Sequence, residues 1–130
     1  YYVGGTATKP GMFVSVAPVR VLDTRSGAPV PGLSDLALTI VGKGGVPATG
    51  VSAVVLNSTV TDTITAGYLT VYPGTTTLPT ASNLNWSTAN STIPNLVTTQ
   101  VGTDGTIKFH NGSPGRTAVI ADTAGYFIGA

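Results

Sequence analysis

Short runs of alternating apolar and polar residues recur along the sequence, and glycine or proline repeatedly interrupts them. In GYLTVYPG, residues 67–74, Leu69 and Val71 would lie on one face of an extended strand and the residues between them on the other. The run VSAVVLNSTV, residues 51–60, has a continuous apolar middle, which favours a strand buried on both faces. The pattern predicts an all-β chain of about nine short strands in an antiparallel β-sandwich, of the jelly-roll or immunoglobulin-like type, with little or no helix.

The composition agrees with this fold and excludes several classes of function. The 130 residues include 17 Gly and 9 Pro, and only 8% are charged, with a formal net charge of +1. Gly, Pro and Thr in place of Ala, Glu and Lys disfavour helices. A net charge so close to zero provides no attraction for nucleic acid, and no run approaches the roughly 18 apolar residues of a membrane-spanning helix. We therefore expect neither a nucleic-acid partner nor membrane insertion.

The same sequence argues against catalysis. There is no Cys, and the single histidine, His110, follows KF near a turn. A nucleophile, a base and an orienting group cannot be assembled from this set, so we expect His110 to be a solvent-facing residue at a strand end and the protein not to be an enzyme. We expect no cofactor. Asp62 and Asp104 lie in loops with many Thr and Gly carbonyls that could hold calcium, but without the ordered acidic spacing of a calcium-binding loop.

The length fits one domain. Residues 1–11, YYVGGTATKPG, form a Gly/Thr/Pro extension that we interpret as an arm, and residues 12–130 as a single β-sandwich domain. The chain opens without an initiator Met or a basic leader, as a secreted product does after its signal segment is removed. Together with few charges and many Thr, Ser and Asn, this predicts a secreted, extracellular or cell-surface protein.

One charged cluster stands out in RVLDTRSG, residues 20–27. It contains Arg20, Asp23 and Arg25, and Asp122 near the end of the chain is a natural second carboxylate for either arginine. We predict a buried polar network that ties the first strand to the last, because buried guanidinium and carboxylate groups stabilise a fold only when they are paired. We expect Asp23→Ala to lower the stability of the fold by a few kcal/mol. A glycosidase acid pair is the alternative, but adjacent arginines would lower both carboxyl pKa values.

Three aromatic residues, Tyr68, Tyr72 and Trp86, are candidates for ligand or interface contacts. A polar strand face that carries Tyr and Trp can stack on sugar rings or anchor a protein interface. In the alternative, Trp86 simply fills the core between two sheets.

The order of several motifs resembles a module found in many secreted bacterial proteins, often near the end of larger chains or in tandem. These motifs are RVLDTR, GVPA, LNxTV, GYLTVYP, SNLNW and DxxGYF, and the similarity covers nearly all of residues 13–128. The resemblance implies an extracellular all-β module and carries no chemistry that can be transferred. It implies buried polar anchors at Asp23, Thr24, Arg25, Asn57, Asn83, Asn85, Asp122 and Tyr126.

Two functions fit these observations. The first is a non-enzymatic extracellular structural module that self-associates as a surface or filament subunit, with the N-terminal arm contacting a neighbouring copy. Low charge leaves little repulsion between copies, and strand addition supplies backbone hydrogen bonds without special side chains. The alternative is a carbohydrate-binding or adhesive module that uses exposed aromatic residues.

Overall fold

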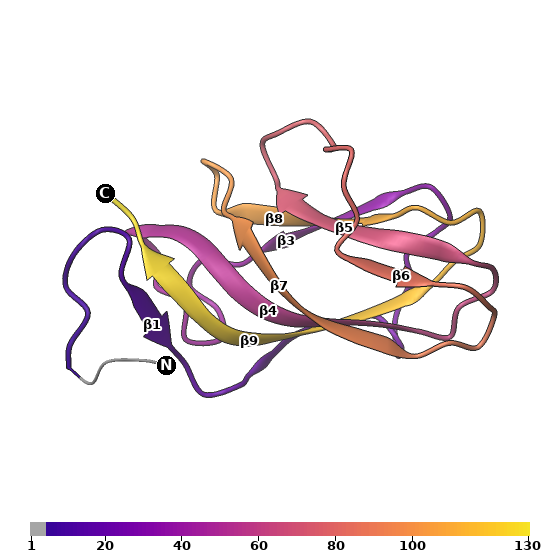
Figure 1. Ribbon diagram of the computed structural model, residues 1–130, viewed down its shortest axis with the longest axis horizontal. Coiled ribbons are helices and arrows are strands. Elements are labelled where there is room, and N and C mark those ends of the chain that lie inside the picture. Colours follow the sequence, from indigo (N-terminus) through magenta and orange to yellow (C-terminus); the bar gives the residue numbers. More distant parts are fainter. Residues whose placement is uncertain (1–4) are drawn as a thin grey trace.

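The computed structural model describes residues 5–130, and these residues form nine β-strands and no helix in two layers (Figure 1). The strands are β1 (Phe13–Ser15), β2 (Arg20–Asp23), β3 (Asp35–Thr39), β4 (Val51–Thr61), β5 (Gly67–Pro73), β6 (Leu84–Trp86), β7 (Ile93–Gln100), β8 (Thr106–Asn111) and β9 (Ala118–Ile128). Every pairing is antiparallel. The predicted all-β sandwich is confirmed. In the described residues no helix is long and apolar enough to span a bilayer.

The larger sheet has five strands in the order β1-β9-β4-β7, with β2 also paired to β9. Strand β9 is long enough to hold β1 along one part of its edge and β2 along the next. The chain leaves the ladder between them, where Pro18 has no N–H to donate. The two short strands therefore form one interrupted edge of this sheet, and β7 forms the opposite edge.

The smaller sheet has four strands in the order β3-β8-β5-β6. Strands β7 and β8 are consecutive in the chain but belong to different sheets, so the turn around Thr103–Gly105 carries the chain from one layer to the other. The turn itself is tight, since Gly105 N donates to Gly102 O at 2.9 Å and Gly105 has a φ of 82°. The turn does not form a hairpin, because β7 and β8 do not pair, and local turn chemistry does not specify which sheet the next strand joins.

The core lies between the sheets. Strand β4 supplies Val54 and Leu56 from one face, and strands β5 and β8 supply Leu69 and Phe109 from the facing sheet. Val55, on the opposite face of β4, is buried as well, as its continuous apolar run predicts.

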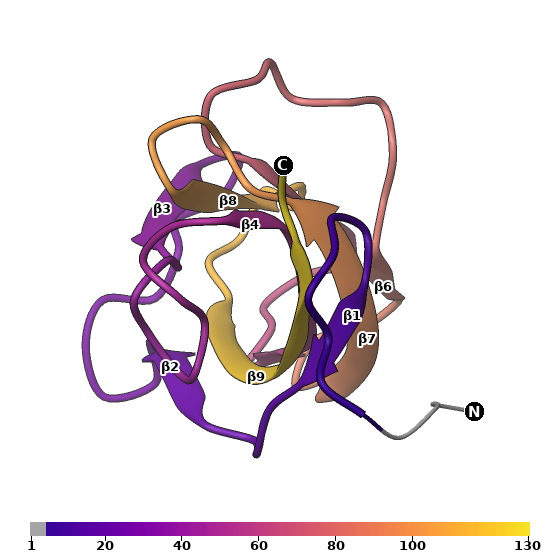
Figure 2. The ribbon, with the colours of Figure 1, turned by 90° about the vertical axis from the view of Figure 1, so that its left-hand side faces the viewer.

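The chain enters the sandwich beside its own last strand. Gly11 N donates to Ile128 O at 2.8 Å, and Ile128 N donates to Met12 O at 3.0 Å, so the ladder begins at Gly11 rather than after it. Figure 2 shows β1 lying against β9 at this end of the molecule. Within the expected arm, residues 1–4 lie outside the described residues, and residues 5–10 are mostly exposed.

Candidate functional site

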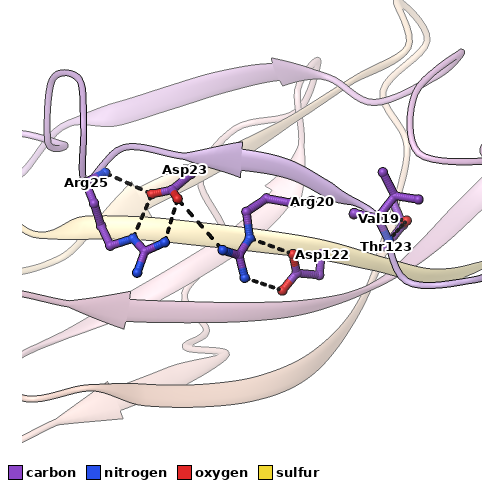
Figure 3. A network of polar contacts seen from close by, with 6 residues as sticks. All are labelled: Val19, Arg20, Asp23, Arg25, Asp122 and Thr123. Carbon is purple, nitrogen blue, oxygen red and sulfur yellow. Dashed lines mark hydrogen bonds and ion pairs between the residues drawn. The ribbon is translucent and has the colours of Figure 1, made fainter.

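Arg20, Asp23, Arg25 and Asp122 form one continuous line of ion pairs across β2 and β9 (Figure 3). Arg20 Nε donates to Asp122 Oδ1 at 2.9 Å and its Nη2 to Oδ2 at 3.3 Å. Arg25 makes the same two-pronged contact with Asp23, at 3.0 and 2.7 Å. A longer contact, 3.9 Å from Arg20 Nη1 to Asp23 Oδ2, joins the two pairs. The structure thus brings together the four charged residues that the sequence singled out.

This network lies on the surface, not in the interior. The Arg20 and Arg25 side chains are 50% and 47% exposed. Asp122 follows Ala121, which belongs to the core, so strand alternation directs Asp122 away from the second sheet. The expectation of a buried network is wrong because it did not identify which face of β9 carries Asp122.

The electrostatics of the network oppose acid–base chemistry. Hydrogen bonds from Arg25 lower the pKa of Asp23 to about 2, and Asp122 raises the pKa of Arg20. A glycosidase needs one carboxylic acid with a raised pKa, and here each carboxylate accepts hydrogen bonds from a guanidinium. The arrangement can hold two strands together and keep a surface charge-neutral.

The other polar positions of the motifs differ in burial. Thr24 is buried, and its hydroxyl accepts a hydrogen bond from Val119 N at 2.8 Å. Asn83 is half-buried and accepts one from Val71 N at 2.7 Å. Asn57 and Asn85 are exposed, so the expectation that they are buried anchors is wrong. Their side chains leave the strands on the faces that point away from the core.

Asn111 is a fully buried polar anchor that the sequence reasoning missed. Its amide donates to three backbone carbonyls, those of Val30, Pro31 and Gly115, at 2.9–3.1 Å. Its Oδ1 accepts hydrogen bonds from Ser113 N and Oγ at 3.0 and 2.9 Å. The only signal in the sequence is the turn-rich NGSPG that begins at Asn111, the last residue of β8.

The three candidate aromatic residues do not share a surface. Trp86 is 5% exposed within the core, and its Nε1 donates to Thr65 O at 2.6 Å, as the core-filling alternative predicts. Tyr72 is 4% exposed and donates its hydroxyl to Asp35 Oδ1 at 2.8 Å. Burial, and then this hydrogen bond, raise the pKa of Tyr72 to about 12. Tyr68 alone of the three is exposed, at 37%.

His110 is buried beside the same carboxylate. Its Nδ1 lies 3.1 Å from Asp35 Oδ1, and its ring centroid lies 6.1 Å from that of Tyr68. The expected solvent-facing position is wrong because β8 is an inner strand, with Asp35 of β3 directly opposite His110. Asp35, Tyr72 and His110 are far apart in the sequence and belong to no common motif, so the sequence did not predict that they meet.

The candidate calcium ligands do not converge within the described residues. Asp104 Oδ1 accepts hydrogen bonds from Thr106 N and Oγ1 at 3.0 and 2.6 Å, which lower the pKa of Asp104 and close its own turn. Among residues 5–130 no group of three or more His, Asp or Glu side chains is placed to hold a metal ion.

A groove lies on the outer face of the smaller sheet, beside Tyr68. Its volume is about 350 Å³, and Tyr68 and Asn85 line it together with Pro79, Thr80, Ala81 and Ser82 of the β5–β6 loop. The loop is tied to β5, because Thr70 Oγ1 donates to Ala81 O and Asn83 N donates to Leu69 O. These contacts explain why Thr70 is buried although it points away from the core.

One long segment of the sandwich carries no charge. The sequence has no Asp, Glu, Lys, Arg or His between Asp62 and Asp104, and this segment contains β5, β6 and β7. In Figure 2, β6 and β7 lie on the same side of the molecule, opposite β3. Asn95 Nδ2 of β7 donates to the carbonyl of Asn83, the residue before β6, at 2.6 Å. We call residues 63–103 the uncharged side. It includes exposed apolar residues at Ile64, Tyr68, Leu78, Ile93 and Leu96.

Strand β7 leaves a row of backbone groups open on this side. Val101 N donates to Ser52 O at 3.0 Å, which fixes the alternation of hydrogen-bonded positions along the β4–β7 ladder. Leu96 and Thr98 fall at the alternate positions, so their N–H and C=O groups point away from β4. Pro94 also lies at one of these outward-facing positions. Because proline has no N–H, this end of the edge has no backbone donor.

Comparison with known protein families gives no matching family, and comparison with curated proteins gives no match. The resemblance of the motifs to a secreted bacterial module stays a prediction.

Proposed function

We propose that this protein is a non-enzymatic, secreted structural module that self-associates at the cell surface or in filaments. The observation that carries the proposal is the open edge of β7 on the uncharged side. An unpaired edge strand is a template for another strand, and proteins that stay monomeric usually protect such an edge with charges. Strand β7 carries no charged residue, and Leu96 on it is 62% exposed.

We propose further that the N-terminal arm of one copy contacts a neighbouring copy along this edge. The arm precedes β1, at one edge of the larger sheet, and β7 forms the opposite edge. Contact between two different surfaces is head-to-tail, and it produces a closed ring or an open filament rather than a two-fold dimer. Backbone hydrogen bonds would provide the affinity, so the arm needs no special side chains.

The low charge of the whole molecule supports the same function. A net charge of +1 gives little electrostatic repulsion between copies. In addition, the Arg20–Asp122 and Arg25–Asp23 pairs neutralise much of the charge near the edge of the larger sheet opposite β7, where β2 pairs with β9.

The test is the native mass of the protein over a range of concentrations, with electron microscopy of any assembly. Removal of residues 1–10 and the substitution Thr98→Lys should each reduce the mass, because the first removes the donor segment and the second places a charge on the acceptor edge. Thr39→Lys is the matched control, since Thr39 is an exposed threonine on β3, the edge strand of the other sheet. It should leave the mass unchanged.

Each contrary result has a definite meaning. A wild-type protein that stays monomeric at all concentrations overturns self-association. Assembly that persists in both altered proteins, with thermal unfolding unchanged, rejects the arm and β7 as the contact. A protein recovered only from the cytoplasm of its native cells rejects the proposed location.

A further inference from the structure

Tyr68 forms an aromatic platform whose position is fixed by Gly112. A Cβ atom added at Gly112 would lie 2.2–2.5 Å from three atoms of the Tyr68 ring, so one end of the ring rests directly on the glycine backbone. Gly112 N also donates to Tyr68 O at 2.8 Å, which fixes the two strands at this point. The ring remains partly exposed and lines the groove of about 350 Å³. An exposed aromatic residue held in place is suited to stacking, because little conformational freedom is lost when a ligand binds.

The other walls of the groove carry uncharged side chains that can donate and accept hydrogen bonds. Asn85 lies directly opposite Tyr68 in the β5–β6 ladder, and its side chain is exposed. Thr80 and Ser82 bring hydroxyl groups from the β5–β6 loop. An amide and hydroxyl groups both donate and accept hydrogen bonds, as the hydroxyl groups of a sugar require.

The groove is also shaped before any ligand arrives. Asn83 Oδ1 accepts a hydrogen bond from Val71 N at 2.7 Å, and Asn83 O accepts one from Asn95 Nδ2 at 2.6 Å. These contacts fix the end of the loop that forms one wall. A volume of about 350 Å³ lies at the lower end of the range of roughly 300–1,000 Å³ typical of small-molecule sites.

We infer that this groove binds a neutral carbohydrate, with the apolar face of one pyranose ring stacked on Tyr68 and its hydroxyl groups bonded to Asn85 and to the loop. None of the lining residues is charged, so the site offers no cationic partner for the carboxylate or sulfate of an acidic sugar. This inference goes beyond the proposed self-association and does not depend on it, because none of the residues that line the groove belongs to β7.

The experiment is a binding screen of the full-length protein on an array of neutral and acidic glycans, followed by calorimetric titration with the neutral oligosaccharide that gives the strongest signal. Tyr68→Ala should weaken binding by about tenfold or more, since stacking on the ring is lost, whereas Tyr68→Phe should retain most of it. Gly112→Ala should also weaken binding, because the added methyl group displaces the ring without removing it.

Leu96→Ala is the matched control, because Leu96 is another exposed apolar residue of the uncharged side but lies on β7. It should leave glycan binding unchanged, so that a failure of self-association and a failure of sugar binding can be told apart. Three results overturn the inference: no neutral glycan bound at millimolar concentration, equal or stronger binding of acidic glycans, or binding that survives both Tyr68→Ala and Gly112→Ala.

Discussion

Arg20 and Asp122 lie opposite each other in the β2–β9 ladder and share two hydrogen bonds, although they are 102 positions apart along the chain. The pair joins the edge of the larger sheet to its long inner strand, and Asp23 and Arg25 extend the contact along β2. Because half of the Arg20 side chain is in contact with water, solvent screens the attraction. The network therefore reinforces a strand pairing that backbone hydrogen bonds already define.

Because the network is exposed, we predict that Asp23→Ala lowers the free energy of unfolding only slightly, not by the few kcal/mol expected of a buried network, and that the loss depends on pH. The folded-state pKa of Asp23 is about 2, compared with 3.8 for the unpaired group, so its contribution is present above pH 3.8 and disappears as the pH falls toward 2. Urea unfolding of both proteins at neutral pH and near pH 2 measures this difference. It should be larger at neutral pH and shrink in high salt. A large loss that depends on neither pH nor salt would contradict the surface assignment.

Asn111 should be far more important for stability than the charged network. Asn111→Ala removes the donor for three backbone carbonyl groups, that of Val30 buried and the other two partly buried, and it removes the acceptor for Ser113. We expect a loss of about 2–4 kcal/mol, since each unsatisfied buried group costs roughly 1–3 kcal/mol and water can satisfy the partly buried ones. Asn57→Ala, on an exposed asparagine of β4, is the matched control and should change stability by less than about 0.5 kcal/mol. Chemical denaturation of the wild type, Asn111→Ala and Asn57→Ala measures the two losses of stability. Equal effects of the two substitutions would refute this role.

The aromatic residues provide a third prediction, because two of them lie in opposite environments. Trp86→Ala should destabilise the fold by about 3–5 kcal/mol, since it empties a core position and removes the hydrogen bond to Thr65. Tyr68→Ala should cost clearly less, because Tyr68 is partly exposed and its loss leaves no enclosed cavity. Thermal unfolding monitored by circular dichroism ranks the two variants. A Tyr68 variant as unstable as the Trp86 variant would make Tyr68 a core residue rather than a binding surface.

Local pattern was sufficient to predict the strands and much of the core. The apolar run Val54–Leu56 is buried on both faces of an inner strand, and alternation placed Leu69 and Val71 in the core. These features depend only on the alternation of apolar and polar residues along each strand and on the turn residues between strands. Each short segment of the sequence contains all of this information.

What the pattern could not predict is which outward faces are covered. Thr70 and Tyr72 point away from the core as Tyr68 does, yet they are buried, whereas the charged side chains on β2 and β9 stay exposed or partly exposed. The β5–β6 loop and the Asp35 carboxylate cover the first face, and both contacts join residues distant in sequence. The meeting of Asp35 with His110 likewise follows from the β3–β8 register. Such registers are decided by the packing of the whole sheet, and no single segment specifies them.

The buried hydroxyl of Tyr72 links stability to alkaline pH. Its folded-state pKa is about 12, above the ordinary value of 10.0, so the contribution of the neutral group is fully present below pH 10 and is lost as the pH rises toward 12. Tyr72→Phe should remove that part of the alkaline decline and cost about 0.5–1.5 kcal/mol at neutral pH, because the hydrogen bond to Asp35 disappears. Denaturation curves collected from neutral to alkaline pH measure both effects, with Tyr68→Phe as the control that keeps the hydroxyl of Tyr72. If the alkaline decline of Tyr72→Phe matched that of the wild type, the Tyr72 hydroxyl would not be the group responsible.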